Sequence, residues 1–384
     1  MDNYKLSTEG ISKMKENEVI IDDINEIIET ANKNSSKINL AVIASVKNKT
    51  ANYNDYKEHS VSTSYLSLAN LDEIIGYFQT SGFFTSVYFD IEDFLAKFYG
   101  EDLTTKPNII LETSPKGTGR GKDALIPCLC DIWNIMHLGP TANTNCLCSS
   151  KYQWTSILKA HGIPTPASFF YSKGFGSDIP LKGVKYILKL NYECASIGLS
   201  DNSVILNDGN NISTYADDLS KKYVQPIIVQ EFISGYEVEV PVLINCNKTI
   251  VFPPVGLSFN GKKLFEKEFL NYDIIYDDNY GFYDFAKVEP HTAEKLKECV
   301  KNIVRVLDLN GYMRIDFRVT ENGEIFVIDI NNDPCIDING SFIYSLKTLG
   351  FKNETIALLL IGNCLYNRKG DLNQQQIKNY SLQN

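Results

Sequence analysis

The chain has 384 residues, of which 43% are hydrophobic and 22% are charged, and this balance excludes an intrinsically disordered protein. A chain of this length is longer than one ordinary core supports, so we expect two or three domains. The formal net charge of −10 argues against a protein whose main ligand is nucleic acid, because the phosphate backbone requires a cationic surface.

The compartment can be inferred from the apolar runs and the cysteines. Residues 1–5 are polar, and apolar runs such as 356–361 are too short to cross a bilayer, so we expect a cytoplasmic protein without membrane contacts. The nine cysteines are dispersed, as is typical of reduced thiols. The pairs that begin at Cys128 and Cys146 could suggest zinc, but buried core thiols are the favoured interpretation.

An N-terminal extension, residues 1–37, precedes the first predicted domain. Its apolar residues follow a helical period: Val19, Ile20, Ile24, Ile27 and Ile28. Alternating strands and helices over 38–140 then predict an α/β domain with a largely parallel sheet. We expect strands at Ile38–Val46, Phe83–Phe89 and Asn108–Leu111, and helices at Leu71–Gln79 and Lys122–Met136. The last helix should bury one apolar face: Leu125, Leu129, Ile132, Trp133 and Met136.

Two further units follow, at 141–229 and 230–366, before a polar tail at 367–384. A helix capped by Ser149-Ser150 opens the first of them and ends at Gly162. Short apolar runs predict strands at Tyr186–Leu190, Ile227–Ile233 and Glu237–Ile244, the last two joined by the turn Ser234-Gly235. A helix at Thr292–Leu307 leads into a hairpin.

The hairpin strand 312–319 alternates between a buried side and a charged side. Met313, Ile315, Phe317 and Val319 share one face, and Arg314, Asp316 and Arg318 share the other. The partner strand, 325–331, follows Asn322-Gly323, which favours a two-residue turn. If Glu321 faces Glu324, the register places Asp316 opposite Asp329 and Arg314 opposite Asn331.

Two carboxylates that face each other across a sheet are destabilising unless a positive charge lies between them. Asp316, Asp329 and the Asn331 carbonyl form an oxygen-only set that suits Mg²⁺, which usually keeps substrate phosphates among its ligands. The set therefore indicates a nucleotide. The alternative is a solvated hairpin whose acids pair with Arg314 and Arg318.

Lys189 interrupts an apolar strand and is followed by a loop of small residues, 194–198, a combination that suits a phosphate. A lysine at a sheet edge whose side chain reaches water is the alternative.

The order of these parts resembles the ATP-grasp family: a strand lysine, a small-residue loop, the phrase 229–237 and the acidic hairpin. The likeness is strongest to D-alanine:D-alanine ligases, in the phrases 160–166, 311–316 and 329–331, and it extends over roughly 38–365. It implies an α/β (α+β) protein with a Rossmann-like parallel-sheet domain, a small central lid domain and a C-terminal antiparallel-sheet domain, with ATP held between the last two.

The resemblance also implies roles for individual residues. Residues that would contact ATP are Lys151, Lys189, Glu193, Ser196, Gly198, Gln230, Glu231, Phe232, Ile233 and Glu237. Residues that would bind Mg²⁺, or Mn²⁺, are Asp316, Asp329 and Asn331. Arg314, Lys189 and Ser196 would serve the reacting groups. Substrate contacts would come from Glu58, Arg314, Cys335, Asn339, Gly340 and Ser341.

Three segments depart from the ligase pattern. Ile275 stands where a phosphate-binding lysine is expected, 115–122 is basic and glycine-rich in place of a histidine-glycine phrase, and 332–341 lacks the pattern that receives a second D-alanine. We therefore expect a ligase that forms an amide bond between amino acids or small peptides through an acyl phosphate. The alternatives are a D-alanine:D-alanine ligase and a non-catalytic ATP-binding protein. A homodimer is the expected assembly.

Overall fold

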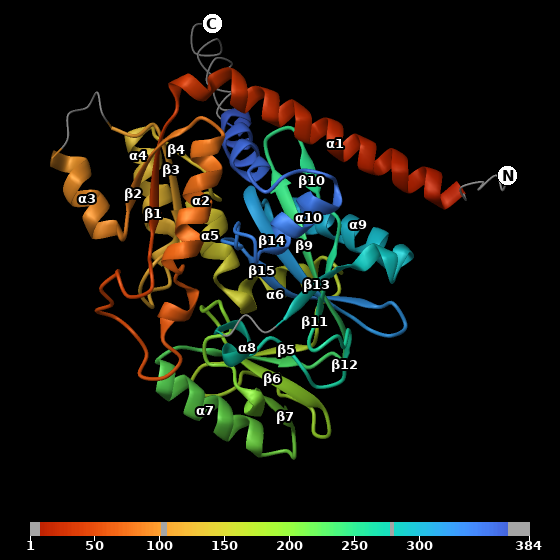
Figure 1. Cartoon of the computed structure of the whole chain (residues 1–384). Coiled ribbons are helices and arrows are strands. Elements are labelled where there is room, and N and C mark those ends of the chain that lie inside the picture. Colours follow the sequence, from red (N-terminus) through yellow and green to blue (C-terminus); the bar gives the residue numbers. More distant parts are fainter. Residues whose placement is uncertain (1–7, 101–105, 277–279, 368–384) are drawn as a thin grey trace, which may run out of the picture.

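A parallel sheet forms the first domain of the computed structural model, which describes residues 8–100, 106–276 and 280–367 (Figure 1). Its strand order is β2-β1-β3-β4. Its elements are β1 (Asn39–Ala44), α2 (Leu68–Thr80), β2 (Phe84–Tyr88), α3 (Ile91–Gly100), β3 (Ile109–Thr113), α4 (Leu125–Trp133) and β4 (Met136–His137). Leu40 and Val42 pack with α2, whereas Ala41 and Ile43 pack with α3 and α4, so β1 is buried on both faces.

Helix α4 differs from its prediction in length and in orientation. The segment begins with a 3₁₀ turn, η3 (Lys122–Ala124), and α4 ends at Trp133 because Asn134 adopts a left-handed conformation with φ +54°. The predicted apolar face is right only in part: Leu129 and Trp133 pack against the core, but Leu125 and Ile132 are exposed while Ile126 and Cys130 are buried. Neighbouring residues on a helix are about 100° apart, and both candidate faces are apolar, so the sequence pattern could not separate them.

The N-terminal extension forms the long helix α1 (Thr8–Asn34), which crosses from the first domain over the C-terminal domain (Figure 1). Ile20, Ile24 and Ile27 are buried as predicted, although Val19 is exposed. They share a core with a helix that begins at Thr355 and reaches at least Asn367. The predicted polar tail beyond this helix lies outside the described residues. Extension and C-terminal helix therefore stabilise each other.

An antiparallel sheet of order β5-β8-β6-β7 forms the central unit, at the bottom of Figure 1. Its elements are β5 (Ser168–Tyr171), β6 (Lys185–Leu190), β7 (Val204–Leu206), α7 (Asn211–Tyr223) and β8 (Ile227–Glu231). Two helices precede it, α5 (Ala142–Cys148) and α6 (Lys151–Ala160). Trp154 and Leu158 of α6 are buried with the C-terminal sheet. The domain boundary expected at 140/141 stays a prediction.

The C-terminal sheet has the order β13-β11-β9-β14-β15, and β10 and β12 also pair with β9. Its elements are β9 (Gly235–Ile244), β10 (Thr249–Val251), β11 (Val255–Ser258), β12 (Leu264–Phe265), α8 (Tyr272–Tyr276), β13 (Gly281–Asp284), α9 (Pro290–Leu307), β14 (Gly311–Val319), β15 (Ile325–Asn331) and α10 (Ser341–Thr348). Helix α9 covers one face. No described helix is long and apolar enough to cross a membrane.

The predicted hairpin between β8 and β9 is not formed, because the two strands belong to different sheets. Gly235 marks the crossing, with φ +143°, and a Cβ there would lie 2.0 Å from the Val319 carbonyl oxygen. The chain thus passes from one unit to the next against β14, which places the end of β8 beside the acidic hairpin.

Candidate functional site

A cleft of about 330 Å³ opens where the first domain, the central unit and the C-terminal sheet meet. Most of the residues singled out from the sequence line it: Lys151, Lys189, Glu193, Ser196, Gln230, Glu231, Phe232, Ile233, Glu237, Arg314, Asp316, Asp329, Asn331, Cys335 and Asn339. Residues that are far apart in the chain are therefore brought together in one cleft. Whether each has the role implied for it stays a prediction.

In the acidic hairpin, Asp316 and Asp329 face each other as predicted, but the turn and the register that bring them together differ from the prediction. Thr320, and not Glu321, faces Glu324, because Gly323 adopts φ +76° and closes a three-residue loop. A bulge at Ile328 then shifts the register by one residue. The two departures cancel, so Asp316 does lie opposite Asp329.

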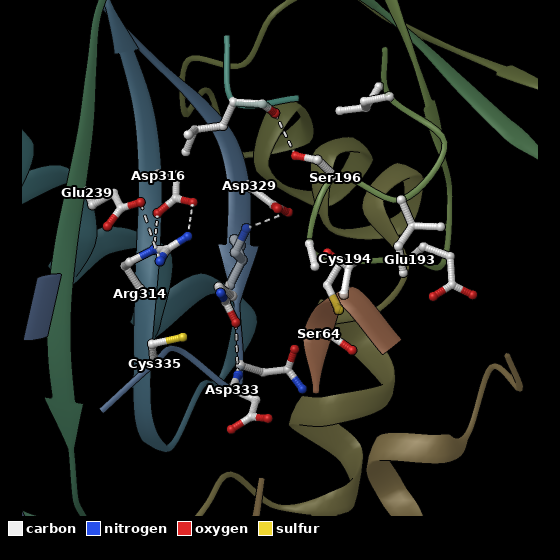
Figure 2. A pocket seen from close by; sticks show the side chains of 18 of the residues that line it. Ser64, Glu193, Cys194, Ser196, Glu239, Arg314, Asp316, Asp329, Asp333 and Cys335 are labelled. Atoms are coloured by element: carbon white, nitrogen blue, oxygen red, sulfur yellow. Dashed lines mark hydrogen bonds and ion pairs between the residues drawn. The ribbon is translucent and has the colours of Figure 1, made fainter. Parts of the chain in front are cut away.

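Arg314 lies between two acidic side chains on the cleft face of β14 and β9 (Figure 2). Its Nε and Nη2 atoms donate to the two carboxylate oxygens of Asp316 at 2.7 and 2.9 Å. Its Nη1 atom lies 3.3 Å from Oε1 of Glu239. This two-point contact is the geometry that a guanidinium prefers and that a lysine cannot reproduce. Asp316 therefore pairs with Arg314 as the alternative interpretation of the hairpin expected, but it is buried and not solvated.

Burial and nearby charges move the acid pKa values in opposite directions. Burial raises the pKa of Asp316, with the negative charge of Glu239 adding to the shift and Arg314 opposing it. Burial would also raise the pKa of Asp329, but the positive charges of Lys151 and Lys189 outweigh it and lower that pKa. Asp329 is therefore the acid that stays charged, and a cation bound beside Asp316 would favour the charged form of that acid as well.

Two lysines extend from the central side of the cleft towards Asp329. Lys151 Nζ donates to the Glu193 main-chain oxygen at 2.6 Å and lies 3.5 Å from Asp329 Oδ1. Lys189 Nζ donates to Gln230 Oε1 at 3.1 Å and to the Ile328 oxygen at 3.3 Å. Burial lowers the pKa of Lys189 to about 8, and Asp329 opposes the shift. A lysine partly stripped of water in this way is suited to an anionic ligand.

The loop 193–198 has an unusual backbone. Ala195 and Ser196 adopt φ values of +49° and +52°, which non-glycine residues rarely do and which are common at ligand-binding sites. Gly198 follows at φ +83°, where a Cβ would lie 2.9 Å from the Leu190 side chain. Gly198 does not itself line the cleft. The Ser196 hydroxyl donates to the Leu270 oxygen at 2.6 Å, which ties the loop to the segment before α8.

The segment 230–237 lines the cleft next to Lys189. The N–H groups of Glu231 and Phe232 donate to main-chain oxygens of Ala167 and Lys185, at 2.8 and 2.9 Å. These two donors are not free for a nucleobase. Glu237, for which a ribose contact was implied, accepts an ion pair from Arg318 at 2.8 Å. The residue lines the cleft, but its carboxylate is held by the protein.

Several implied substrate contacts lie elsewhere. Glu58 is exposed outside the cleft and pairs with Lys222 of α7, so the geometry does not support its role. Gly340 caps α10, and Ser341 is buried at the start of that helix and does not line the cleft. The side chain of Ile275 lies outside the described side chains.

Three cleft residues were missed from the sequence. Glu239 alternates with Val238 and Val240 on β9, so the strand-period argument used for the hairpin could have found it. Lys122 reaches Glu193 at 3.2 Å from the basic stretch of the first domain. Asp333 accepts from the Ser114 N–H at 2.7 Å. The last two depend on contacts between distant segments, which no local pattern shows.

Two antiparallel α+β units share one cleft next to a parallel-sheet domain, which is the ATP-grasp fold. Residues 185–361 match the family model described as D-ala D-ala ligase C-terminus, and the chain is similar to D-alanine–D-alanine ligases. The D-alanine–D-alanine ligase of Mannheimia succiniciproducens is 24% identical over 63% of this chain and 76% of its own. The D-alanine–D-alanine ligase of Aquifex aeolicus is 28% identical over 56% of this chain and 68% of its own.

Solved structures share the fold of the described chain. The D-alanine–D-alanine ligase from Bacillus anthracis complexed with ATP superposes with a TM-score of 0.64 and 14% identity, covering 87% of this chain and 99% of that one. The VanG D-Ala:D-Ser ligase from Enterococcus faecalis superposes with a TM-score of 0.61 and 16% identity, covering 85% of this chain and 99% of that one. The expected ATP-grasp fold class is thereby confirmed.

Proposed function

We propose that this chain is an ATP-dependent ligase that joins the carboxylate of an amino acid or small peptide to an amine. The γ-phosphoryl group would move to a carboxylate oxygen, giving an acyl phosphate and ADP. The amine nitrogen would then attack the acyl carbon, phosphate would leave with the electrons of its C–O bond, and the nitrogen would lose a proton. The convergence of Arg314, Asp316, Asp329, Lys151 and Lys189 in one cleft carries this proposal.

The donor set of the hairpin fits Mg²⁺. In the described part of the chain no three histidine, cysteine or acidic side chains gather closely enough to hold a metal ion by themselves. Mg²⁺ commonly takes one or two protein carboxylates and completes its shell with waters and phosphates. Asp316, Asp329 and Asn331 would hold the ion, which when bound neutralises charge on the transferring phosphoryl group.

The protein's own cations have separate roles in this proposal. Lys151 and Lys189 bind the phosphates and orient them towards Asp329. Three of the five N–H donors of Arg314 point to Asp316 and Glu239. The other two could donate to the oxyanion that forms when the amine attacks the acyl carbon. A fixed donor of this kind is commonly worth about 3 kcal/mol in the transition state. No covalent nucleophile is required.

A D-alanine–D-alanine ligase is the second candidate, because the family model named for these ligases matches residues 185–361, which include Lys189, Asp316 and Asp329. The segments 115–122 and 332–341 depart from that family, and both contribute to the cleft. The VanG D-Ala:D-Ser ligase has the same fold with a different named substrate pair, so the fold alone does not select D-alanine. We therefore propose a different amine or carboxylate substrate.

Phosphate release from Mg-ATP in the presence of pooled amino acids and dipeptides tests the proposal. Asp329→Ala should abolish substrate-dependent release, whereas Asp178→Ala, at an exposed position that does not line the cleft, should retain it. Mass spectrometry of an active pool would identify the amide product. Tight Mg-ATP binding without release from any pool would overturn the ligase in favour of a non-catalytic ATP-binding protein.

A further inference from the structure

A segment of the first domain, residues 55–61, extends onto the central unit. We call it the strap. Asp55 organises the strap, because its Oδ1 atom accepts the N–H groups of Tyr56 at 2.7 Å and of Val61 at 2.9 Å. The strap then follows the central unit from α7 to α8, and Figure 1 shows this part of the first domain reaching down towards both helices. Its shape is therefore fixed locally before it meets its partners.

The strap makes its buried contact at Glu193, the first residue of the loop 193–198. Tyr56 donates its hydroxyl to Glu193 Oε1 at 2.6 Å and accepts from Gln225 Nε2 at 2.8 Å. Lys122, also from the first domain, donates to Glu193 Oε2 at 3.2 Å. The Lys122 and Glu193 side chains are 8% and 1% exposed, so water does not compensate for a lost contact here.

A second contact joins the strap to the other end of the same loop. His59 Nδ1 accepts the Gly198 N–H at 3.2 Å, and its ring stacks on Tyr272 of α8 with 4.3 Å between centroids. The Tyr272 hydroxyl donates to the Ser60 oxygen at 3.4 Å. Both ends of the loop are therefore held by a segment that belongs to another domain.

We propose that the strap fixes the loop 193–198 in its closed conformation, with Tyr56 and Lys122 as positioning residues that act through Glu193 on Lys151. The Glu193 side chain is held by the first domain, while its main-chain oxygen accepts Lys151 Nζ. Lys151 in turn lies against Asp329. The inference rests on the proposed function in one respect, that the cleft binds Mg-ATP.

The expected size follows from the cost of ordering the loop. When only a fraction of the molecules has the loop closed, the apparent affinity for a ligand of the closed form falls by that fraction. A hydrogen bond to a buried charged group is strong enough to change such a population by about tenfold or more. Loss of the Tyr56 hydroxyl should therefore weaken Mg-ATP binding by about tenfold without changing the residues that contact ATP.

Calorimetric titration of the full chain with Mg-ATP, without other substrates, tests the inference in Tyr56→Phe. We expect the Kd to rise about tenfold and amide hydrogen exchange at 193–198 to accelerate about tenfold. Tyr53→Phe is the matched control: this tyrosine precedes the strap, its ring is 88% exposed, and both the Kd and the exchange should stay within twofold of the wild type. Thermal unfolding of both variants checks that they fold alike.

A double-mutant cycle with Glu193→Gln distinguishes the strap from a general loss of packing. Tyr56→Phe should have little further effect on the Kd once the Glu193 carboxylate is gone. An unchanged Kd in Tyr56→Phe, or an equal effect in both backgrounds, would overturn the proposal. Because the readouts are binding and exchange, a chain that binds Mg-ATP but makes no amide would refute the ligase and leave the strap standing.

Discussion

The two walls of the cleft are built from different kinds of structure. Lys189, Gln230, Arg314, Asp316 and Asp329 all lie on β-strands, and we call them the strand wall. The loop wall consists of residues that lie between or at the ends of elements: Ser64, Asp333 and Cys335, which Figure 2 labels, and Asn339. Strands fix the directions of their side chains by alternation, whereas loops depend on the elements that flank them. We therefore propose that the strand wall carries out phosphoryl transfer and that the loop wall selects the substrate.

The largest effect is expected where the strand wall carries the metal set. Asp329→Asn removes the charge that faces Asp316 and leaves Lys151 without its acidic partner. We expect substrate-dependent phosphate release to fall about 1000-fold, the upper range for loss of one electrostatic group in a transition state. Steady-state kinetics over a Mg²⁺ series measures it. A fall of less than tenfold would show that the hairpin carboxylates are not needed for the reaction.

A second prediction separates two arginines on the same strand. Arg314→Lys keeps the charge but loses the two-point contact with Asp316, and kcat should fall about 100-fold with little change in the KM for ATP. Arg318→Lys disturbs the ion pair with Glu237 and should chiefly raise that KM. The variants are matched in chemistry and differ only in position along β14. Equal effects on both parameters in both variants would contradict the separate roles proposed for the two arginines.

A third prediction concerns the sheet behind the loop wall. His137 on β4 has no solvent-exposed ring nitrogen, and burial lowers its pKa to about 4. The unfolded chain therefore takes up the proton first, so this residue's contribution to stability is present above the unfolded pKa of about 6.5 and is lost as pH falls towards 4. Between pH 7 and pH 5 the loss should be roughly 2 kcal/mol.

Denaturant unfolding of wild type and His137→Leu at the two pH values measures this contribution. Other groups titrate in both proteins, so the difference between the two pH dependences isolates the histidine. Between pH 7 and pH 5 we expect the free energy of unfolding to fall less in the variant than in the wild type, by roughly 2 kcal/mol. Parallel pH dependences would show that the imidazole becomes protonated in the folded protein without cost.

The strand wall was largely predictable from the sequence, whereas the loop wall was predicted only in part, at Cys335 and Asn339. Alternation alone placed Asp316 and Arg314 on one face, and the pairing with Asp329 was right because a longer turn and a bulge compensate each other. Glu239 obeys the same alternation and was overlooked. Glu58 was misplaced because its position depends on how the first domain meets α7, a contact between segments far apart in the chain. Short-range periodicity cannot contain such information.

The smallest predicted effect probes the loop wall directly. Cys335 is an exposed cleft residue beside Arg314 in Figure 2, and Cys335→Ala removes one sulfur atom from the wall. A change of this size in a binding pocket alters discrimination between substrates by about tenfold. Competing pairs of amines that differ by one methylene, quantified by product mass, should therefore give a shifted product ratio. Cys128→Ala, which alters an exposed thiol on α4, should leave the ratio unchanged.

Mg-ATP binding should be the same in both variants, because neither substitution changes a residue of the strand wall. A change in ATP affinity without a change in product ratio would place Cys335 on the nucleotide side and would break the distinction between the two walls.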